Sequence, residues 1–162
     1  MPPHYQGKVY LSPAIADARV AQPALQALID AFKTYWQTGI HPHFGKDAPL
    51  HRPPVIVLSA VRHVHLRPLT PVDADRWQRP FTRLEPERRP TSNRWLAYCV
   101  TDRRNCCLLA YFDELAHEQA ERVDVIHRLT SWAEWFFRQT GEFPLPMSEQ
   151  ADIFGEQWLV GE

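Results

Sequence analysis

The stretch that decides the fold is Arg94-Trp95-Leu96-Ala97-Tyr98-Cys99-Val100, followed after five polar residues (101–105) by Cys106-Cys107-Leu108-Leu109-Ala110-Tyr111. Both runs are rich in aromatic and aliphatic residues, and the residues between them have the length and composition of a hairpin turn. We therefore predict an antiparallel hairpin. All three cysteines lie in these runs without a C-x-x-C spacing, so we expect buried, reduced thiols.

Further elements are predicted on either side of this hairpin. Short apolar runs predict strands at residues 8–11, 55–58 and 61–66, the last two forming one bent strand or a hairpin. Apolar residues at helical spacing predict helices over about 23–37 and 114–138, each followed by a glycine. Residues 40–54 and the proline-rich stretch 68–93 are expected to be irregular.

This order predicts an α+β fold, in which a small antiparallel sheet is packed by an N-terminal helix and a long C-terminal helix. At 162 residues the chain is long enough for one domain with a substantial core. We assign residues 1–140 to this single domain. Residues 141–162 hold five acidic and no basic residues, and we expect them to form an acidic extension with exposed apolar groups at Phe143, Ile153, Phe154 and Trp158.

The predicted strand Val61-Arg62-His63-Val64-His65-Leu66-Arg67 carries the strongest functional signal. Because side chains alternate along a strand, His63, His65 and Arg67 share one face, and Val64 and Leu66 share the other. Imidazoles exchange protons near neutral pH, and a guanidinium binds phosphate. This face therefore holds groups that can bind a phosphate and move protons around it, although a half-exposed strand with two solvated histidines has the same pattern.

The net charge of −1 conceals an uneven distribution along the chain. Residues 41–111 hold twelve basic and six acidic side chains, and eleven of the basic ones are arginines. Residues 112–162 hold three basic and eleven acidic side chains. The arginine-rich middle flanks the histidine strand and favours contact with phosphate groups.

Sequence signals for a membrane or for secretion are missing. No apolar run approaches the roughly 20 residues of a membrane span, and the first residues lack the basic start and apolar stretch of a signal peptide. Together with the cysteine usage, this leads us to expect a cytoplasmic protein with no membrane partner.

Four segments, taken in order, resemble the YafO family of bacterial toxins. They are residues 39–48, 62–66, 91–99 and 125–134, and the likeness extends over about residues 8–139. The resemblance implies a RelE-like toxin fold and a type II toxin that cleaves mRNA on the ribosome. It implies a cognate antitoxin, mRNA and the ribosome (rRNA) as partners, and acid–base chemistry without a metal or organic cofactor.

Residue roles follow from this resemblance and from the chemistry of RNA cleavage, which needs a base, an acid and cations. We expect catalytic roles for His63, His65, Tyr98 and Arg83. We expect RNA contacts from Lys46, Arg62, Arg67, Arg89, Ser92, Asn93 and Arg94. Tyr98 is equally compatible with a buried structural role, and residues 91–93 with capping of a turn.

The chain also departs from the family pattern at two places. Residues 84–90 are additional, and Asn93 stands where the family often has an acidic residue, so no carboxylate can act there.

Two alternative functions remain open on sequence grounds. A toxin-like domain without catalysis could hold another protein, with the apolar groups of residues 141–162 as the docking segment. The pairs His41/His43 and His63/His65 could instead ligate a metal ion, although the sequence marks no third ligand.

Overall fold

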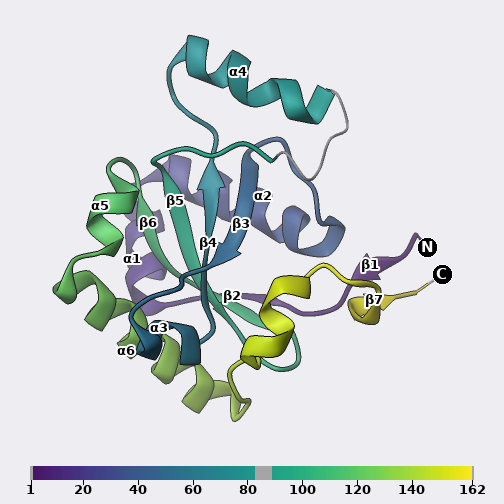
Figure 1. Ribbon diagram of the computed structural model, residues 1–162, viewed down its shortest axis with the longest axis vertical. Coiled ribbons are helices and arrows are strands. Elements are labelled where there is room, and N and C mark those ends of the chain that lie inside the picture. The colour runs from purple at the N-terminus through teal and green to yellow at the C-terminus, as the bar shows by residue number, and fades with distance from the viewer. Residues whose placement is uncertain (1, 83–88, 162) are drawn as a thin grey trace.

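The computed structural model describes residues 2–82 and 89–161 and has a five-stranded sheet with helices on both faces (Figure 1). The sheet order is β2-β6-β5-β4-β3, where β2 runs parallel to β6 and the other neighbours are antiparallel. The strands are β2 (Val9–Leu11), β3 (Phe44–Pro49), β4 (Val61–Leu66), β5 (Trp95–Val100) and β6 (Cys106–Phe112). A separate pair, β1 (His4–Tyr5) and β7 (Leu159–Val160), joins the two ends of the described chain.

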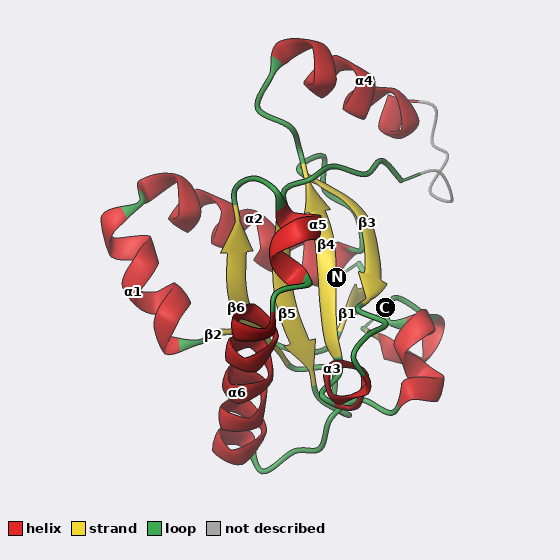
Figure 2. Cartoon of the chain, turned by 60° about the vertical axis from the view of Figure 1, so that its left-hand side comes forward, coloured by secondary structure: helices red, strands yellow, loops and turns green. Residues whose placement is uncertain are grey.

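Helices and short 3₁₀ turns surround this sheet. The α-helices are α1 (Pro13–Ala21), α2 (Pro23–Thr38), α3 (Pro54–Leu58), α4 (Pro71–Thr82), α5 (Ala116–Ala120) and α6 (Val123–Thr140). The 3₁₀ turns are η2 (Met147–Asp152) and η3 (Glu156–Trp158). In Figures 1 and 2, α4 lies beyond one end of the sheet, apart from the other helices.

The sheet divides the apolar core into two layers. On one face, α1, α2 and the C-terminal segment pack against a cluster that includes Phe32, Trp36 and Val64. On the other face, α3, α5 and α6 pack against a cluster that includes Ala97, Cys99 and Leu109 (Figure 2). This arrangement confirms the predicted α+β class, with β2 as the one parallel addition to an otherwise antiparallel sheet.

Several predicted elements are confirmed. The hairpin forms as β5 and β6, the histidine strand forms as β4, and residues 9–11 of the predicted first strand form β2. The predicted N-terminal helix is α2, which ends at Gly39 with a left-handed φ of 81°, a conformation that glycine adopts at little cost. The three cysteines are free and buried, as expected.

Three predictions for segments around the histidine strand are wrong. Residues 55–58 form α3, because Pro54 starts a helix readily at its first position and short apolar runs do not separate strand from helix. Residues 44–49 form β3, where pairing with β4 outweighs a composition poor in strand formers. Residues 71–82 form α4, again with a proline at its start and with Asp73 in the first turn.

The helical predictions also need correction at both ends of the chain. The expected long helix over 114–138 is divided into α5 and α6, and Leu115 before α5 has a left-handed φ of 52°. Residues 13–21 form α1, for which no helix was predicted, although Ser12 accepts a capping hydrogen bond from Ile15 N and Pro13 begins the helix.

The C-terminal segment is integrated in the core. Leu145, Ile153 and Trp158 are buried in the layer that also holds α2, so the expectation that Ile153 and Trp158 are exposed is wrong. Phe154 is partly buried against this layer, and Phe143 is exposed as expected. None of the helices in the described residues has the length and hydropathy needed to cross a membrane.

Candidate active site

The two histidines of β4 lie side by side on the sheet face that α6 covers. His63 pairs in register with Ala97, and His65 pairs with Trp95 on β5. Their ring centroids are 5.2 Å apart. Val64 and Leu66 point to the opposite layer and are buried there, so the predicted alternation along this strand is confirmed.

Ser92 fixes the His65 ring through its backbone. The Ser92 N–H donates to His65 Nδ1 at 2.8 Å, and the Trp95 Nε1–H reaches the same nitrogen at 3.2 Å. The Ser92 carbonyl oxygen also lies 2.7 Å from Nδ1, where it accepts a hydrogen bond when that nitrogen carries a proton. Ser92 therefore anchors Nδ1 in either tautomer, and no described residue hydrogen-bonds to Nε2, which is left for proton exchange.

Burial keeps both imidazoles neutral near pH 7. It lowers the pKa of His63 to about 4, with a further contribution from His65. It also lowers the pKa of His65, although the Ser92 carbonyl opposes this shift by stabilising the protonated ring. A neutral imidazole can accept a proton, which is the state that a general base requires.

Trp95 and His117 complete the surroundings of this pair. The His63 ring lies 4.2 Å from the Trp95 ring, centroid to centroid, and the ring of His117 on α5 lies 5.9 Å from the Trp95 ring. The Nδ1 atom of His63 is buried and has no hydrogen-bond partner among the described residues. Neither Trp95 nor His117 was predicted from the sequence as part of the site. The pairing of β4 with β5 places Trp95 opposite His65, and this register is the signal that would have identified the tryptophan.

Lys46, another predicted RNA-binding residue, lies on the strand next to the histidine strand. It is exposed on β3, the edge strand beside β4, and its backbone N–H donates to Pro90 O. Its positive charge is one of the causes that lower the pKa of His65, after burial. Lys46 therefore adds positive charge to the surroundings of His65.

Arg62 and Tyr98 lie on the opposite face of the sheet from the histidines. Both are buried, and both bind the carboxylate of Asp47: Arg62 Nε lies 3.0 Å from Oδ1, and the Tyr98 hydroxyl donates to Oδ2 at 2.5 Å. Burial and the Asp47 charge raise the pKa of Tyr98 well above its ordinary value. The structure therefore joins these two residues to each other and separates them from His63 and His65.

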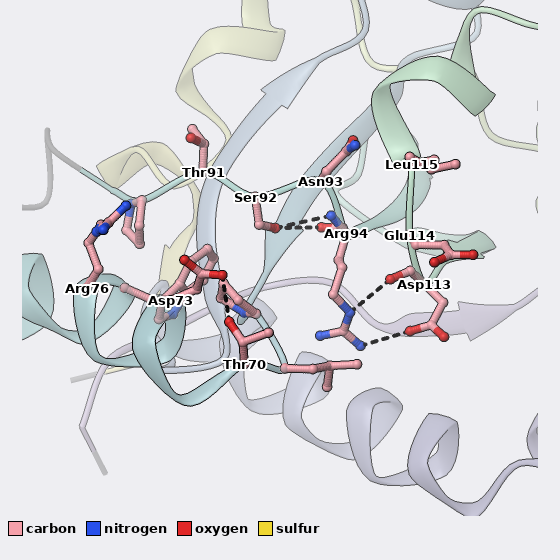
Figure 3. A pocket seen from close by; sticks show the side chains of 14 residues that line it. Thr70, Asp73, Arg76, Thr91, Ser92, Asn93, Arg94, Asp113, Glu114 and Leu115 are labelled. Carbon is pink, nitrogen blue, oxygen red and sulfur yellow. Dashed lines mark hydrogen bonds and ion pairs between the residues drawn. The ribbon is translucent and has the colours of Figure 1, made fainter.

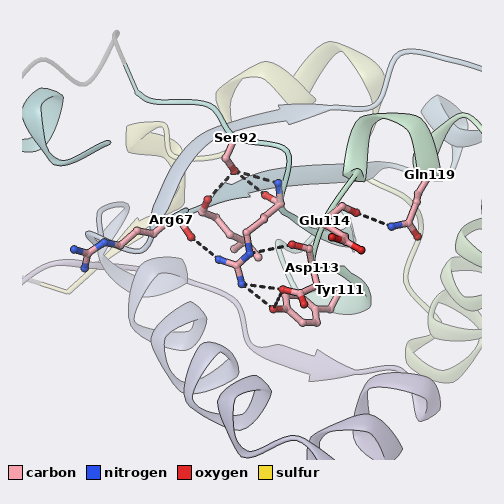
Figure 4. Close-up of polar contacts among 8 residues, drawn as sticks. Arg67, Ser92, Tyr111, Asp113, Glu114 and Gln119 are labelled. Atoms are coloured by element: carbon pink, nitrogen blue, oxygen red, sulfur yellow. Dashed lines mark hydrogen bonds and ion pairs between the residues drawn. The ribbon is translucent and has the colours of Figure 1, made fainter. Parts of the chain in front are cut away.

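Residues 92–94 connect the histidines to the neighbouring loops. The side chain of Asn93 caps α5 by accepting from His117 N, and it also donates to Glu118. The Arg94 guanidinium binds the Tyr111 hydroxyl and Asp113 at the end of β6 (Figure 4). Both side chains are thus held by protein groups, and Asn93 caps a helix, whereas the sequence suggested capping of a turn.

The remaining predicted arginines are spread more widely. Arg67 is exposed just after β4, and its carbonyl oxygen accepts from Arg94. Arg89 donates to the carbonyl oxygen of Gly39 at 3.3 Å. Arg83 lies outside the described residues.

A cavity of about 750 Å³ is lined in part by residues 90–94, which include Ser92, the residue that contacts His65. Figure 3 shows that α4 forms one side of it and that residues 113–115 form the other. Ser92 lines this cavity and also holds His65, so the two sites share a wall.

The described part of the chain has no group of three or more histidine, cysteine, aspartate or glutamate side chains placed to hold a metal ion. The His63/His65 pair therefore has no third ligand of these types among residues 2–82 and 89–161.

Comparison with known proteins identifies the family. The family model described as "Toxin YafO, type II toxin-antitoxin system" matches residues 33–139, about two thirds of the chain, which include both histidines, Lys46, Trp95 and His117. No curated protein and no solved structure gives a significant match to the chain. The chain therefore belongs to the YafO family of type II toxin–antitoxin system toxins.

Proposed function

We propose that this protein is an endoribonuclease that cleaves mRNA on the ribosome, and that a cognate antitoxin neutralises it. The observation that carries the proposal is the His63–His65 pair, two neutral imidazoles on one sheet face beside an exposed lysine. Family membership supports a toxin role and an antitoxin partner. Translating ribosomes would place the site of action in the cytoplasm.

The reaction uses the 2′-hydroxyl of RNA as its nucleophile. A neutral imidazole takes the proton from the 2′-hydroxyl, and O2′ attacks the neighbouring phosphorus. The P–O5′ bond then breaks, and the leaving O5′ receives a proton from the protonated imidazole. The products are a 2′,3′-cyclic phosphate and a 5′-hydroxyl end, and no proton is gained or lost overall.

His65 suits the proton-transfer role because its position does not depend on its protonation state. Ser92 offers an N–H donor and a carbonyl acceptor at Nδ1, so the ring stays in place while Nε2 gains or loses a proton. Lys46 would offset the negative charge that builds up on the phosphate in the transition state. The proposed mechanism needs neither a metal ion nor an organic cofactor.

Expression of the full chain in a bacterial host tests the proposal. We expect growth arrest and cleaved transcripts, with cyclic phosphate ends at the cuts and with cleavage of purified mRNA only when ribosomes are translating it. His63→Ala with His65→Ala should abolish cleavage, whereas the control His127→Ala, an exposed position on α6, should not. Normal growth and intact mRNA at high levels of folded protein would refute the proposal.

A further inference from the structure

A third imidazole, that of His117 on α5, belongs to the cluster of rings around Trp95. The centroid of the Trp95 ring lies 5.9 Å from that of His117 and 5.5 Å from that of His65, and both contacts are edge-to-face. The two histidines also interact electrostatically. Burial is the main cause that lowers the pKa of His65, and the charges of Lys46 and His117 lower it further.

Consecutive residues anchor the two imidazoles. The Ser92 N–H donates to Nδ1 of His65 at 2.8 Å. The next residue, Asn93, holds the start of α5, because its side-chain oxygen accepts from the His117 N–H at 2.8 Å and its carbonyl oxygen accepts from Ala116 N at 3.1 Å. Since adjacent Cα atoms are about 3.8 Å apart, a single residue step relates the group that fixes His65 to the group that fixes His117.

The backbone just before His117 has an uncommon conformation. Leu115 has a left-handed φ of 52°, although it is neither glycine nor asparagine and its side chain is exposed. Such a conformation costs free energy and persists where the surrounding structure imposes it, which is frequent at functional sites. Here the hydrogen bonds from Asn93 to the two residues that follow Leu115 hold the chain in place.

The surroundings of His117 differ from those of the two histidines on β4. Its side chain is 67% exposed, and its Nε2 lies 3.7 Å from the carboxylate of Glu121, with which it forms an ion pair when the ring is protonated. Glu121 also binds Arg52 at 3.3 Å, and Glu118 interacts electrostatically with His117. His63, by contrast, is kept neutral because burial lowers its pKa to about 4. His117 is therefore suited to bring a proton to a substrate.

RNA cleavage by the 2′-hydroxyl needs proton transfers at two different places. The attacking O2′ and the leaving O5′ lie roughly in line, on opposite sides of the phosphorus. Ser92 holds the ring of His65 in one position, so this imidazole serves one of the two oxygens. A second group has to serve the other.

We propose that His117 is the general acid of this site and donates a proton to the leaving O5′, while His65 accepts the proton of the 2′-hydroxyl. Glu121 orients the ring through Nε2, and Nδ1 of His117, which has no hydrogen-bond partner among the described residues, faces the substrate. When the O2′–P bond has formed and the P–O5′ bond has broken, His65 carries a proton and His117 is neutral. Proton exchange with water then restores both rings. This inference rests on the proposed ribonuclease function and assigns its second proton transfer.

An RNA in which sulfur replaces O5′ at the cleaved linkage tests this role, because a thiolate leaves without being protonated. The cut is first mapped on an ordinary mRNA bound to ribosomes, and single-turnover cleavage of the two forms of that sequence is then compared. We expect His117→Ala to slow cleavage of ordinary RNA by about 100-fold and to cleave the sulfur-containing RNA within about threefold of the wild-type rate. His65→Ala should slow cleavage of both RNAs.

The pH dependence of cleavage is a second measurement of the same role. The wild-type rate on ordinary RNA should decline at alkaline pH, where the general acid has lost its proton, and His117→Ala should lack this decline. The control His127→Ala, at an exposed position on α6, should cleave both RNAs at the wild-type rate. Thermal unfolding of His117→Ala checks that the fold is intact, as the exposure of this side chain leads us to expect.

The outcomes separate this inference from the proposed function. Wild-type rates for His117→Ala on ordinary RNA, or equal slowing on the two RNAs, would overturn the role of His117 and leave the ribonuclease proposal standing. A folded wild-type protein that cleaves neither RNA on ribosomes would refute the ribonuclease proposal, and the role of His117 with it.

Discussion

Asp47 on β3 and Arg62 on β4 form a buried ion pair on the reverse side of the strand that carries the histidines. Arg62 Nε lies 3.0 Å from Asp47 Oδ1, and the two side chains are 3% and 7% exposed. The hydroxyls of Tyr35 and Tyr98 donate to Asp47 Oδ2, and Arg62 also donates to the carbonyl oxygen of Gln150. The pair thus links α2, three neighbouring strands and the C-terminal segment.

Breaking this pair from one side should destabilise the protein strongly. Arg62→Met leaves the Asp47 carboxylate buried without its cation, and we expect a loss of about 3–5 kcal/mol in the free energy of unfolding. The double variant Arg62→Met with Asp47→Asn should recover part of this loss, because it buries no unpaired charge. Urea denaturation of the wild type, the single variants Arg62→Met and Asp47→Asn, and the double variant measures both effects. If the losses of the two single variants add up to that of the double variant, the pair is not coupled.

The C-terminal segment should be required for folding. Trp158 is 8% exposed in the core layer of α2, and the same segment supplies Ile153 O to the buried Arg104 guanidinium and Gln150 O to Arg62. We expect Trp158→Ala to cost about 3 kcal/mol, and a chain that ends at Gly141 to lose its cooperative thermal transition. Phe143→Ala, at an exposed position of the same segment, is the matched control and should change stability little.

Stability should decrease as the pH falls from about 7 toward 4, and His63 should account for part of this decrease. Burial lowers the pKa of His63 to about 4 in the folded protein, from an ordinary value of 6.5. Between these values the unfolded chain binds a proton that the folded protein does not, so acid favours unfolding. This contribution of His63 to the free energy of unfolding is fully present above pH 6.5 and is lost as the pH falls to 4, and it amounts to about 3 kcal/mol at most.

Urea denaturation at several pH values isolates the part due to His63. The variant His63→Gln should show a shallower pH dependence than the wild-type protein over pH 4–6.5. His127→Gln, at an exposed position, should keep the wild-type dependence. Identical slopes for His63→Gln and the wild type would show that His63 titrates normally.

The core of the fold was predictable where periodicity extends over many residues. The hairpin, β4 and α2 follow from alternation or helical spacing that burial enforces. By contrast, β3 contains Gly45, Lys46 and Pro49 and becomes a strand only through its pairing with β4, which local composition cannot reveal. The helix α3 was missed because five apolar residues fit either period.

The histidine site was predictable in part. Alternation along β4 places His63 and His65 on one face and Arg62 on the other, but it says nothing about Tyr98, which lies on β5. The register between β4 and β5 decides which β4 residues share a face with Tyr98. It pairs Tyr98 with Arg62 and so separates it from the histidines. Trp95 and His117 come together with His65 only when the hairpin and α5 are in place, so no local pattern marks them.

Gly45 should be required for the attachment of α4. A Cβ atom at position 45 would lie 2.2 Å from Pro90 O and 2.5 Å from Cη2 of Trp77, the residue that holds α4 through a 2.8 Å hydrogen bond from its Nε1 to Pro42 O. Because Trp77 is buried, Gly45→Ala must displace it or the strand, and we expect a loss of about 1–3 kcal/mol.

The direction of that displacement can be measured. If the Trp77 ring moves outward, Gly45→Ala should shift tryptophan fluorescence to longer wavelength. In proteins that carry Trp77→Leu, Gly45→Ala should cause no such shift. It should also cost less stability there than in the protein that keeps Trp77. An alanine variant with wild-type stability and fluorescence would show that α4 does not depend on this contact. Since Trp77 also lines the cavity between α4 and residues 90–94, Gly45→Ala should change the shape of that cavity while leaving the His65–Ser92 hydrogen bond in place.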